Sequence, residues 1–181
     1  MFDHSTPETD TWQETLCRGD IVLFRFPEID SVDDVAKIRP CLVLEVASTD
    51  GQRQATLAYG TTARTSANRG YEIWIKRRSS LAIAGLDRQT RFVGARTAIV
   101  SLDHADFDQG PRGTPVIGHL DAHLIERMHA VRARLYAERD IATEIRRDKR
   151  EERLRWLRET AALAAENRGK ASWNGQLGGS V

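Results

Sequence analysis

Cysteine and net charge are both scarce in this chain of 181 residues. The two cysteines, Cys17 and Cys41, are too few and too far apart for a disulfide scaffold or a cysteine-based zinc site. Because Cys41 lies in an apolar run, residues 40–44, we expect it to be a small core side chain in a reducing compartment. The formal net charge is only +1, so no overall positive field marks the protein as a nucleic-acid binder.

Long hydrophobic runs are missing as well. No apolar stretch approaches the roughly 20 residues that a membrane-spanning helix needs, and the N-terminus lacks the basic patch and apolar run of a secretory signal. The content of 40% hydrophobic and 29% charged residues is ordinary for a folded domain. These features predict a soluble, cytoplasmic protein with no membrane partner, large enough for one domain and an appendage.

The charges that are present are unevenly distributed. The charged residues of 1–34 are mostly acidic, set against Arg18 and Arg25, whereas basic residues outnumber acidic ones from Lys37 to Arg96. A basic middle behind an acidic front is compatible with phosphate binding on one face of the protein.

Alternating and continuous apolar segments predict short strands, followed by helices. Asp50-Gly51 is typical of a hairpin turn, and Asp121 is suited to cap the helix that follows it. This order indicates an α+β domain, a small barrel of five to seven strands capped by a helix, with an extra C-terminal helical arm. The expected strands cover residues 20–26, 38–46, 54–59, 71–76, 91–93 or 97–102, and 116–118; the expected helices cover 79–86, 121–138 and 141–167.

The predicted organisation has four parts: a flexible tail (1–16), the barrel domain (17–139), a charged helix (140–168) and a disordered tail (169–181). The charged helix carries both positive and negative residues, which is typical of a solvated helix stabilised by i,i+4 ion pairs such as Glu151 with Arg155. Alternatively, it is an arm that binds RNA, a partner subunit or an antitoxin. An apolar seam for such packing would consist of Leu154, Leu157, Ala161 and Ala164.

Arg39 lies where the acidic segment meets a buried strand, and Pro40 restricts it to an extended backbone. Arginine is well shaped for two-point phosphate recognition, so Arg39 is a candidate for contact with a phosphate group. The alternative is that Arg39 pairs with Asp33 or Asp34.

A strand that ends in Gly60, Thr61 and Thr62 is the second candidate feature. Hydroxyl groups and free backbone N–H groups at a strand end can hold an anionic oxygen. The alternative is a turn in which a threonine side chain caps the backbone.

Five short motifs occur in one order along residues 18–139. They are Arg18-Gly19-Asp20-Ile21-Val22, Arg39-Pro40-Cys41-Leu42-Val43-Leu44, Ala58-Tyr59-Gly60-Thr61-Thr62, Gly85-Leu86 with Thr90-Arg91-Phe92, and Ile117-Gly118-His119-Leu120-Asp121. In this order and spacing they resemble the MazF/PemK family of toxins, in its PemK-like branch.

The resemblance implies an SH3-like barrel that forms a homodimer and cleaves single-stranded RNA without a metal or cofactor. Cleavage by such an enzyme leaves 2′,3′-cyclic phosphate and 5′-hydroxyl ends. The resemblance also implies a cognate antitoxin, which neutralises the toxin and together with which such toxins bind DNA. The catalytic residues implied are Arg39, as a charge stabiliser and proton donor or acceptor, and Thr61, as a phosphate-oxygen donor. Because a guanidinium stays protonated near neutral pH, charge stabilisation is the better-supported role of Arg39. The predicted RNA contacts are Lys37, Thr62, Arg64 and Arg91.

Three points depart from this interpretation or compete with it. The segment 28–34 is strongly acidic where the family loop is usually glycine-rich, so a catalytically inactive barrel that binds nucleic acid or protein is the alternative function. Some family members use a later arginine and a later aspartate in catalysis, and Arg91 and Arg96 are the nearby candidates for this arginine. His119 and His123 would serve a metal or acid–base site instead.

Overall fold

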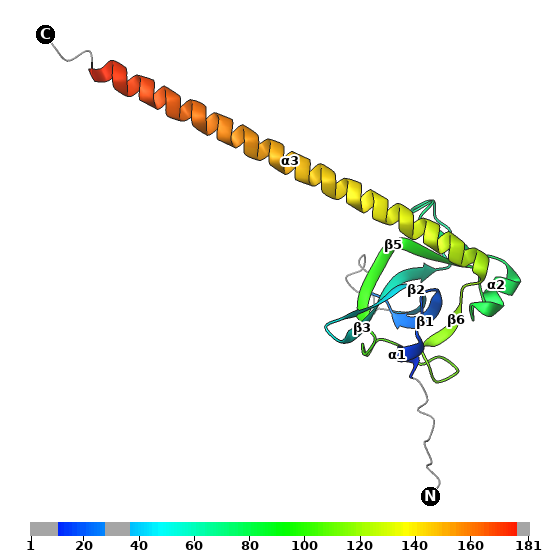
Figure 1. Ribbon diagram of the computed structural model, residues 1–181. Coiled ribbons are helices and arrows are strands. Elements are labelled where there is room, and N and C mark those ends of the chain that lie inside the picture. Colours follow the sequence, from blue (N-terminus) through cyan, green and yellow to red (C-terminus); the bar gives the residue numbers. More distant parts are fainter. Residues whose placement is uncertain (1–10, 28–36, 177–181) are drawn as a thin grey trace, which may run out of the picture. The chain divides into compact units, whose positions relative to one another are not determined.

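The computed structural model describes residues 11–27 and 37–176 (Figure 1). Six strands form one antiparallel sheet that curls into a half-barrel, in the order β4-β5-β3-β2-β1-β6. The strands are β1 (Asp20–Arg25), β2 (Ile38–Thr49), β3 (Gln52–Thr61), β4 (Glu72–Ile75), β5 (Thr90–Ser101) and β6 (Val116–His119), and the helices are α1 (Trp12–Thr15), α2 (Arg78–Ile83) and α3 (Ala122–Gln176). The predicted mixture of strands and helices is confirmed.

The chain divides into two compact units, Met1–Leu135 and Tyr136–Val181. The first unit contains the whole sheet, α1, α2 and the first turns of α3. The second consists of the remaining turns of α3 and exposes large apolar side chains, among them Ile141 and Trp156. Within the described residues, no helix is both long enough and apolar enough to span a bilayer.

Strand alternation gives the sheet two apolar faces, and each face has its own core. On one face, Ile21, Leu42 and Phe92 pack with Met128 and Val131 of α3; we call this the helix-side core. On the other face is the far-side core, which the sheet shares with Leu16 and Leu102. Its strand residues are Val22, Phe24, Cys41, Val43, Ala55, Leu57 and Tyr59. Cys41 is fully buried, as expected from its apolar run.

The β2–β3 hairpin turns at Asp50-Gly51, as predicted. Both residues have positive φ, 51° and 79°, and the flanking pair Thr49 and Gln52 closes the loop. Two consecutive left-handed residues are required by the tight turn whose twist matches that of the strands. The turn therefore fixes the register of β2 against β3.

A single strand, β5, covers both alternatives expected in this part of the sequence. Its register against β3 is interrupted: Ala58 pairs with Thr97, but the next residue, Tyr59, pairs with Val93. Gly94, Ala95 and Arg96 fill this interval and form a bulge.

The expected helices 121–138 and 141–167 are one continuous helix, α3. No glycine or proline separates the two ranges, so nothing in the backbone breaks the helix there. The predicted cap is confirmed at its beginning, where Asp121 Oδ1 accepts a hydrogen bond of 3.0 Å from the Leu124 N–H. The helix also continues past Gly169, where the sequence predicted a disordered tail.

Part of the predicted flexible tail is folded. Within it, α1 begins where the Thr11 N–H donates to the Glu14 carboxylate at 2.7 Å, which lowers the pKa of Glu14. Leu16 is buried, and the Arg53 guanidinium donates to the carbonyls of Glu14 and Leu16. A segment without apolar periodicity is held here by contacts with a distant strand.

Candidate functional site

Arg39 and Thr61 lie at the same end of the β2–β3 hairpin, away from its turn. Cys41 pairs with Tyr59, and an antiparallel register continued by two residues brings Arg39 level with Thr61. The strands approach closely there: a Cβ atom on Gly60 would lie 2.0 Å from the Pro40 carbonyl oxygen. Only glycine fits this position, so Gly60 allows the ends of the two strands to meet.

Tyr59 organises the charged groups next to these strand ends. The Arg39 Cζ lies 5.3 Å from the centre of the Tyr59 ring, and the Arg96 Cζ lies 4.1 Å from it. The Phe26 ring packs against Tyr59 at 5.3 Å between centroids and also lies 5.9 Å from the Arg96 Cζ. We call Arg39, Tyr59, Thr61 and Arg96 the two-arginine cluster.

The cluster concentrates positive charge on an aromatic support. Arginine is charged at neutral pH; the ring face of Tyr59 attracts both guanidinium groups by cation–π interaction, and that of Phe26 attracts the Arg96 guanidinium. Two like charges near one ring repel each other, so an anion that bridges them is stabilised by both. A phosphate matches this requirement, since each guanidinium can donate two parallel hydrogen bonds.

Cys41 borders the cluster but does not supply a nucleophile. Burial raises the pKa of its thiol to about 12, although the Gly60 N–H and the nearby Arg39 charge act in the opposite direction. The thiolate is the reactive form of cysteine, so Cys41 remains an inert thiol at neutral pH.

Arg96 reaches Tyr59 because of the bulge in β5. A Cβ atom on Gly94 would lie 2.8 Å from Val131 Cγ1, and the Gly94 N–H donates to the Tyr71 carbonyl at 2.8 Å. Bulges redirect side chains and are common beside active sites. A glycine inside a strand pattern is the one sequence signal of such a bulge, and it could have favoured Arg96 over Arg91 as the second arginine.

Arg91, predicted to contact RNA, is instead an internal clamp. It is 4% exposed, and its Nη1 atom lies 2.5 Å from the Glu72 carboxylate. It also donates to the carbonyls of Thr65 and Ala67 and to the Thr65 hydroxyl. These bonds fasten the loop between β3 and β4 and leave the guanidinium no access to an RNA phosphate.

The other predicted contacts are exposed and surround the strand ends. Lys37 immediately precedes β2, and Arg64 donates to the Gln89 side chain at 3.1 Å. Thr61 Oγ1 accepts the Ala63 N–H at 3.1 Å, so this hydroxyl also caps the turn, which was the alternative interpretation. Thr62 is exposed and lines a groove of about 290 Å³, which we call the Pro40 groove. Its full lining is Leu23, Pro40, Thr62, Gly85, Leu86, Asp87, Arg88, Thr90, Pro111 and Ile117.

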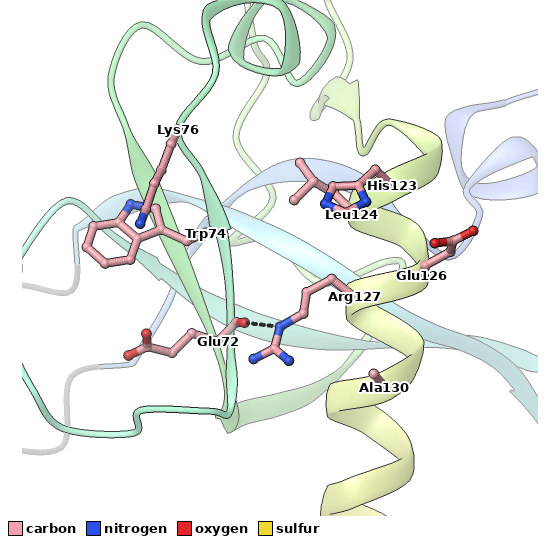
Figure 2. A pocket seen from close by; sticks show the side chains of 8 residues that line it. All are labelled: Glu72, Trp74, Lys76, His123, Leu124, Glu126, Arg127 and Ala130. Carbon is pink, nitrogen blue, oxygen red and sulfur yellow. Dashed lines mark hydrogen bonds between the residues drawn. The ribbon is translucent and has the colours of Figure 1, made fainter.

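A larger groove of about 560 Å³ lies between β4 and the beginning of α3 (Figure 2). Lys76 stands over the Trp74 ring, with its Nζ 4.0 Å from the ring centre, and Arg127 donates to the carbonyls of Glu72 and Gly70. These contacts attach α3 to the edge of the sheet, and no predicted catalytic or RNA-contacting residue lines this groove. The lining residues are Glu72, Trp74, Lys76, His123, Leu124, Glu126, Arg127 and Ala130.

The two histidines of the alternative site are not part of a metal-ligand set. His119 is exposed on β6 opposite Asp20, and His123 lines the groove of Figure 2. Over residues 11–27 and 37–176 there is no group of three or more metal-binding side chains. The acidic segment 28–34, including the proposed partners Asp33 and Asp34, lies outside the described residues.

The chain matches no family model and no curated protein.

Proposed function

We propose that the protein is a metal-independent endoribonuclease, a toxin of the MazF/PemK kind that cleaves single-stranded RNA. The two-arginine cluster is the observation that carries this proposal. Arg39 and Arg96 approach one tyrosine ring from different strands, and Thr61 lies level with Arg39. A cluster of donors with fixed positive charge suits a reaction in which negative charge builds up on a phosphate group.

The reaction would be an internal transesterification. The ribose 2′-oxygen forms a bond to phosphorus, the bond from phosphorus to the 5′-oxygen breaks, and a 2′,3′-cyclic phosphate remains. The 2′-hydroxyl loses one proton to solvent and the 5′-oxygen gains one, so no metal or co-reactant is needed. Arg39 and Arg96 would stabilise the charge on the pentavalent phosphate, and the Thr61 hydroxyl would donate to one of its oxygens.

The curled sheet is compatible with an SH3-like barrel, which forms part of the same proposal. A homodimer would assemble the RNA groove from two barrels, and an antitoxin would neutralise the enzyme by covering that groove. The exposed residues Lys37 and Arg64 near the strand ends would contact the RNA backbone.

Single-stranded RNA incubated with the full-length protein in excess EDTA tests the proposal. We expect endonucleolytic fragments whose 3′ ends are cyclic phosphates and whose 5′ ends accept phosphate from a kinase without prior dephosphorylation. Cleavage that disappears with EDTA and returns with a divalent ion would contradict the proposal and indicate a metal-dependent reaction.

One observation favours the second candidate, a barrel that binds nucleic acid without cutting it. Neither arginine of the cluster is suited to accept the 2′-hydroxyl proton, because a guanidinium is acceptor-free at neutral pH. Tight binding of RNA that stays intact over long incubation, with Arg39→Ala reducing the affinity, would support this candidate instead.

A further inference from the structure

The Pro40 groove opens at the same strand ends as the two-arginine cluster. Pro40 directly follows Arg39, and Thr62 directly follows Thr61. Successive side chains of a strand point to opposite faces, so the groove and the cluster lie on opposite faces of the sheet at these strand ends. A single-stranded RNA that passes over the strand ends with its phosphate at Arg39 would bring the adjoining base to the groove.

Half of the residues that line the Pro40 groove are aliphatic, and two are charged. Leu23, Pro40, Leu86, Pro111 and Ile117 supply aliphatic surface. Thr62, Asp87 and Arg88 are exposed lining residues with polar side chains. A small apolar site with a few polar groups at its edge is the usual construction of a specific ligand pocket.

Asp87 and Arg88 are adjacent charged residues that hold no other part of the described chain through an ion pair. In the described part of the chain, neither forms an ion pair, whereas Glu72 and Asp106 each pair with an arginine. The backbone below them is fixed, since Gly85 has φ +66° and a Cβ atom there would lie 2.1 Å from the Ile117 carbonyl oxygen. The carboxylate and the guanidinium are thus presented together from a loop of defined shape.

We infer that the Pro40 groove binds the RNA base next to the cleaved phosphate and selects guanine, an inference that rests on the proposed function. Guanine alone offers two adjacent donors, N1–H and N2–H, which match the two oxygens of Asp87. Its O6 and N7 acceptors match the guanidinium of Arg88. Uracil would place carbonyl oxygens against the Asp87 carboxylate, and adenine and cytosine lack the second adjacent donor.

The test is equilibrium binding of fully 2′-O-methylated RNA pentamers, which cannot undergo attack by a 2′-hydroxyl. A single guanine or a single adenine is moved through a uracil background, and affinities are measured by fluorescence anisotropy with the full-length protein. We expect one position at which guanine binds about tenfold more tightly than adenine, the size typical of one bidentate base contact. Replacing that guanine by inosine, which lacks the N2 donor, is expected to remove most of this preference.

The variant Asp87→Asn should bind guanine and inosine equally, because its amide cannot accept both donors. Asp103→Asn, an exposed aspartate outside the groove, is the matched control and should keep the preference. Equal binding of all pentamers, or a preference that Asp87→Asn leaves unchanged, overturns the inference. A guanine preference that depends on Asp87, in a protein that does not cleave unmodified RNA, supports the groove and rejects the proposed nuclease activity.

Discussion

Arg91 and Arg96 lie on one strand, β5, yet their surroundings are opposite. Arg91 is buried, ion-paired with Glu72 and bonded to the β3–β4 loop. Arg96 is half-buried in the bulge and stacks on Tyr59, and no carboxylate of the described residues pairs with it. A guanidinium with its own carboxylate stabilises the fold, whereas one supported only by ring faces retains its capacity to bind an anion.

The largest effect is expected at the buried pair. Arg91→Met should lower the free energy of unfolding by about 3–5 kcal/mol, because the Glu72 carboxylate, which is only 12% exposed, would lose its charged partner. Urea denaturation followed by circular dichroism measures this loss. The double variant Arg91→Met/Glu72→Leu should recover much of it, and an unchanged midpoint for Arg91→Met alone would mean that the pair is not a structural clamp.

Arg39→Ala should have the next largest effect, on cleavage instead of stability. Removing one charged donor from the phosphate should slow single-turnover cleavage by roughly 100- to 1000-fold. Arg39→Lys should restore only part of the rate, because an ammonium lacks the planar two-point fork.

Arg18→Ala, an exposed arginine outside the cluster, is the matched control for Arg39→Ala and should keep the full rate. Full activity of Arg39→Ala would remove Arg39 from the catalytic site. Lost activity together with a collapsed melting curve would identify Arg39 as a structural partner instead, as the alternative pairing with Asp33 or Asp34 supposes.

Arg96→Ala should slow cleavage by about 10- to 100-fold, less than Arg39→Ala, because Arg39 and not Arg96 lies level with Thr61 at the strand ends. The free energy of unfolding should change by less than about 1 kcal/mol, in contrast to Arg91→Met. Comparing rates and denaturation curves of the two variants tests the distinction directly. If Arg96→Ala lowers the stability as much as Arg91→Met does and leaves the cleavage rate of the folded protein unchanged, the roles assigned to the two arginines are wrong.

Thr61→Ala is expected to have the smallest effect, a loss of up to about tenfold in rate, because a neutral hydroxyl is a weaker donor than a guanidinium. Thr61→Ser keeps the hydroxyl and should retain nearly the full rate. Since Thr61 also caps the turn through the Ala63 N–H, a thermal melt is needed alongside. Equal rates for the alanine and serine variants would reduce Thr61 to this capping role.

Local features of the fold were predictable from the sequence, and those that depend on distant contacts were not. Asp50-Gly51 predicted the hairpin and its turn, since the left-handed backbone there is a local requirement. The burial of Arg91 could not be predicted, because Glu72 becomes its neighbour only through the pairing of β4 with β5. Helix α1 was missed for the same reason, since Arg53 and Phe107 hold it from elsewhere in the chain.

The candidate site divides in the same way. Arg39 and Thr61 could be predicted from short motifs at strand ends, because the residue type alone suggests its chemistry there. Arg96 becomes part of the site only because Gly94 allows Val131 of α3 and the Tyr71 carbonyl to approach the strand. That approach depends on how α3 packs on the sheet, and Gly94 itself, a glycine inside a strand pattern, is the one local signal of it.

The unequal burial of the two cysteines provides a specific chemical handle. Cys17 is exposed, whereas burial raises the pKa of Cys41 to about 12, so a thiol-reactive dye at neutral pH should modify Cys17 alone. The natural chain can therefore carry one fluorophore without any engineered substitution. Energy transfer after mixing donor-labelled and acceptor-labelled samples would then test the proposed homodimer.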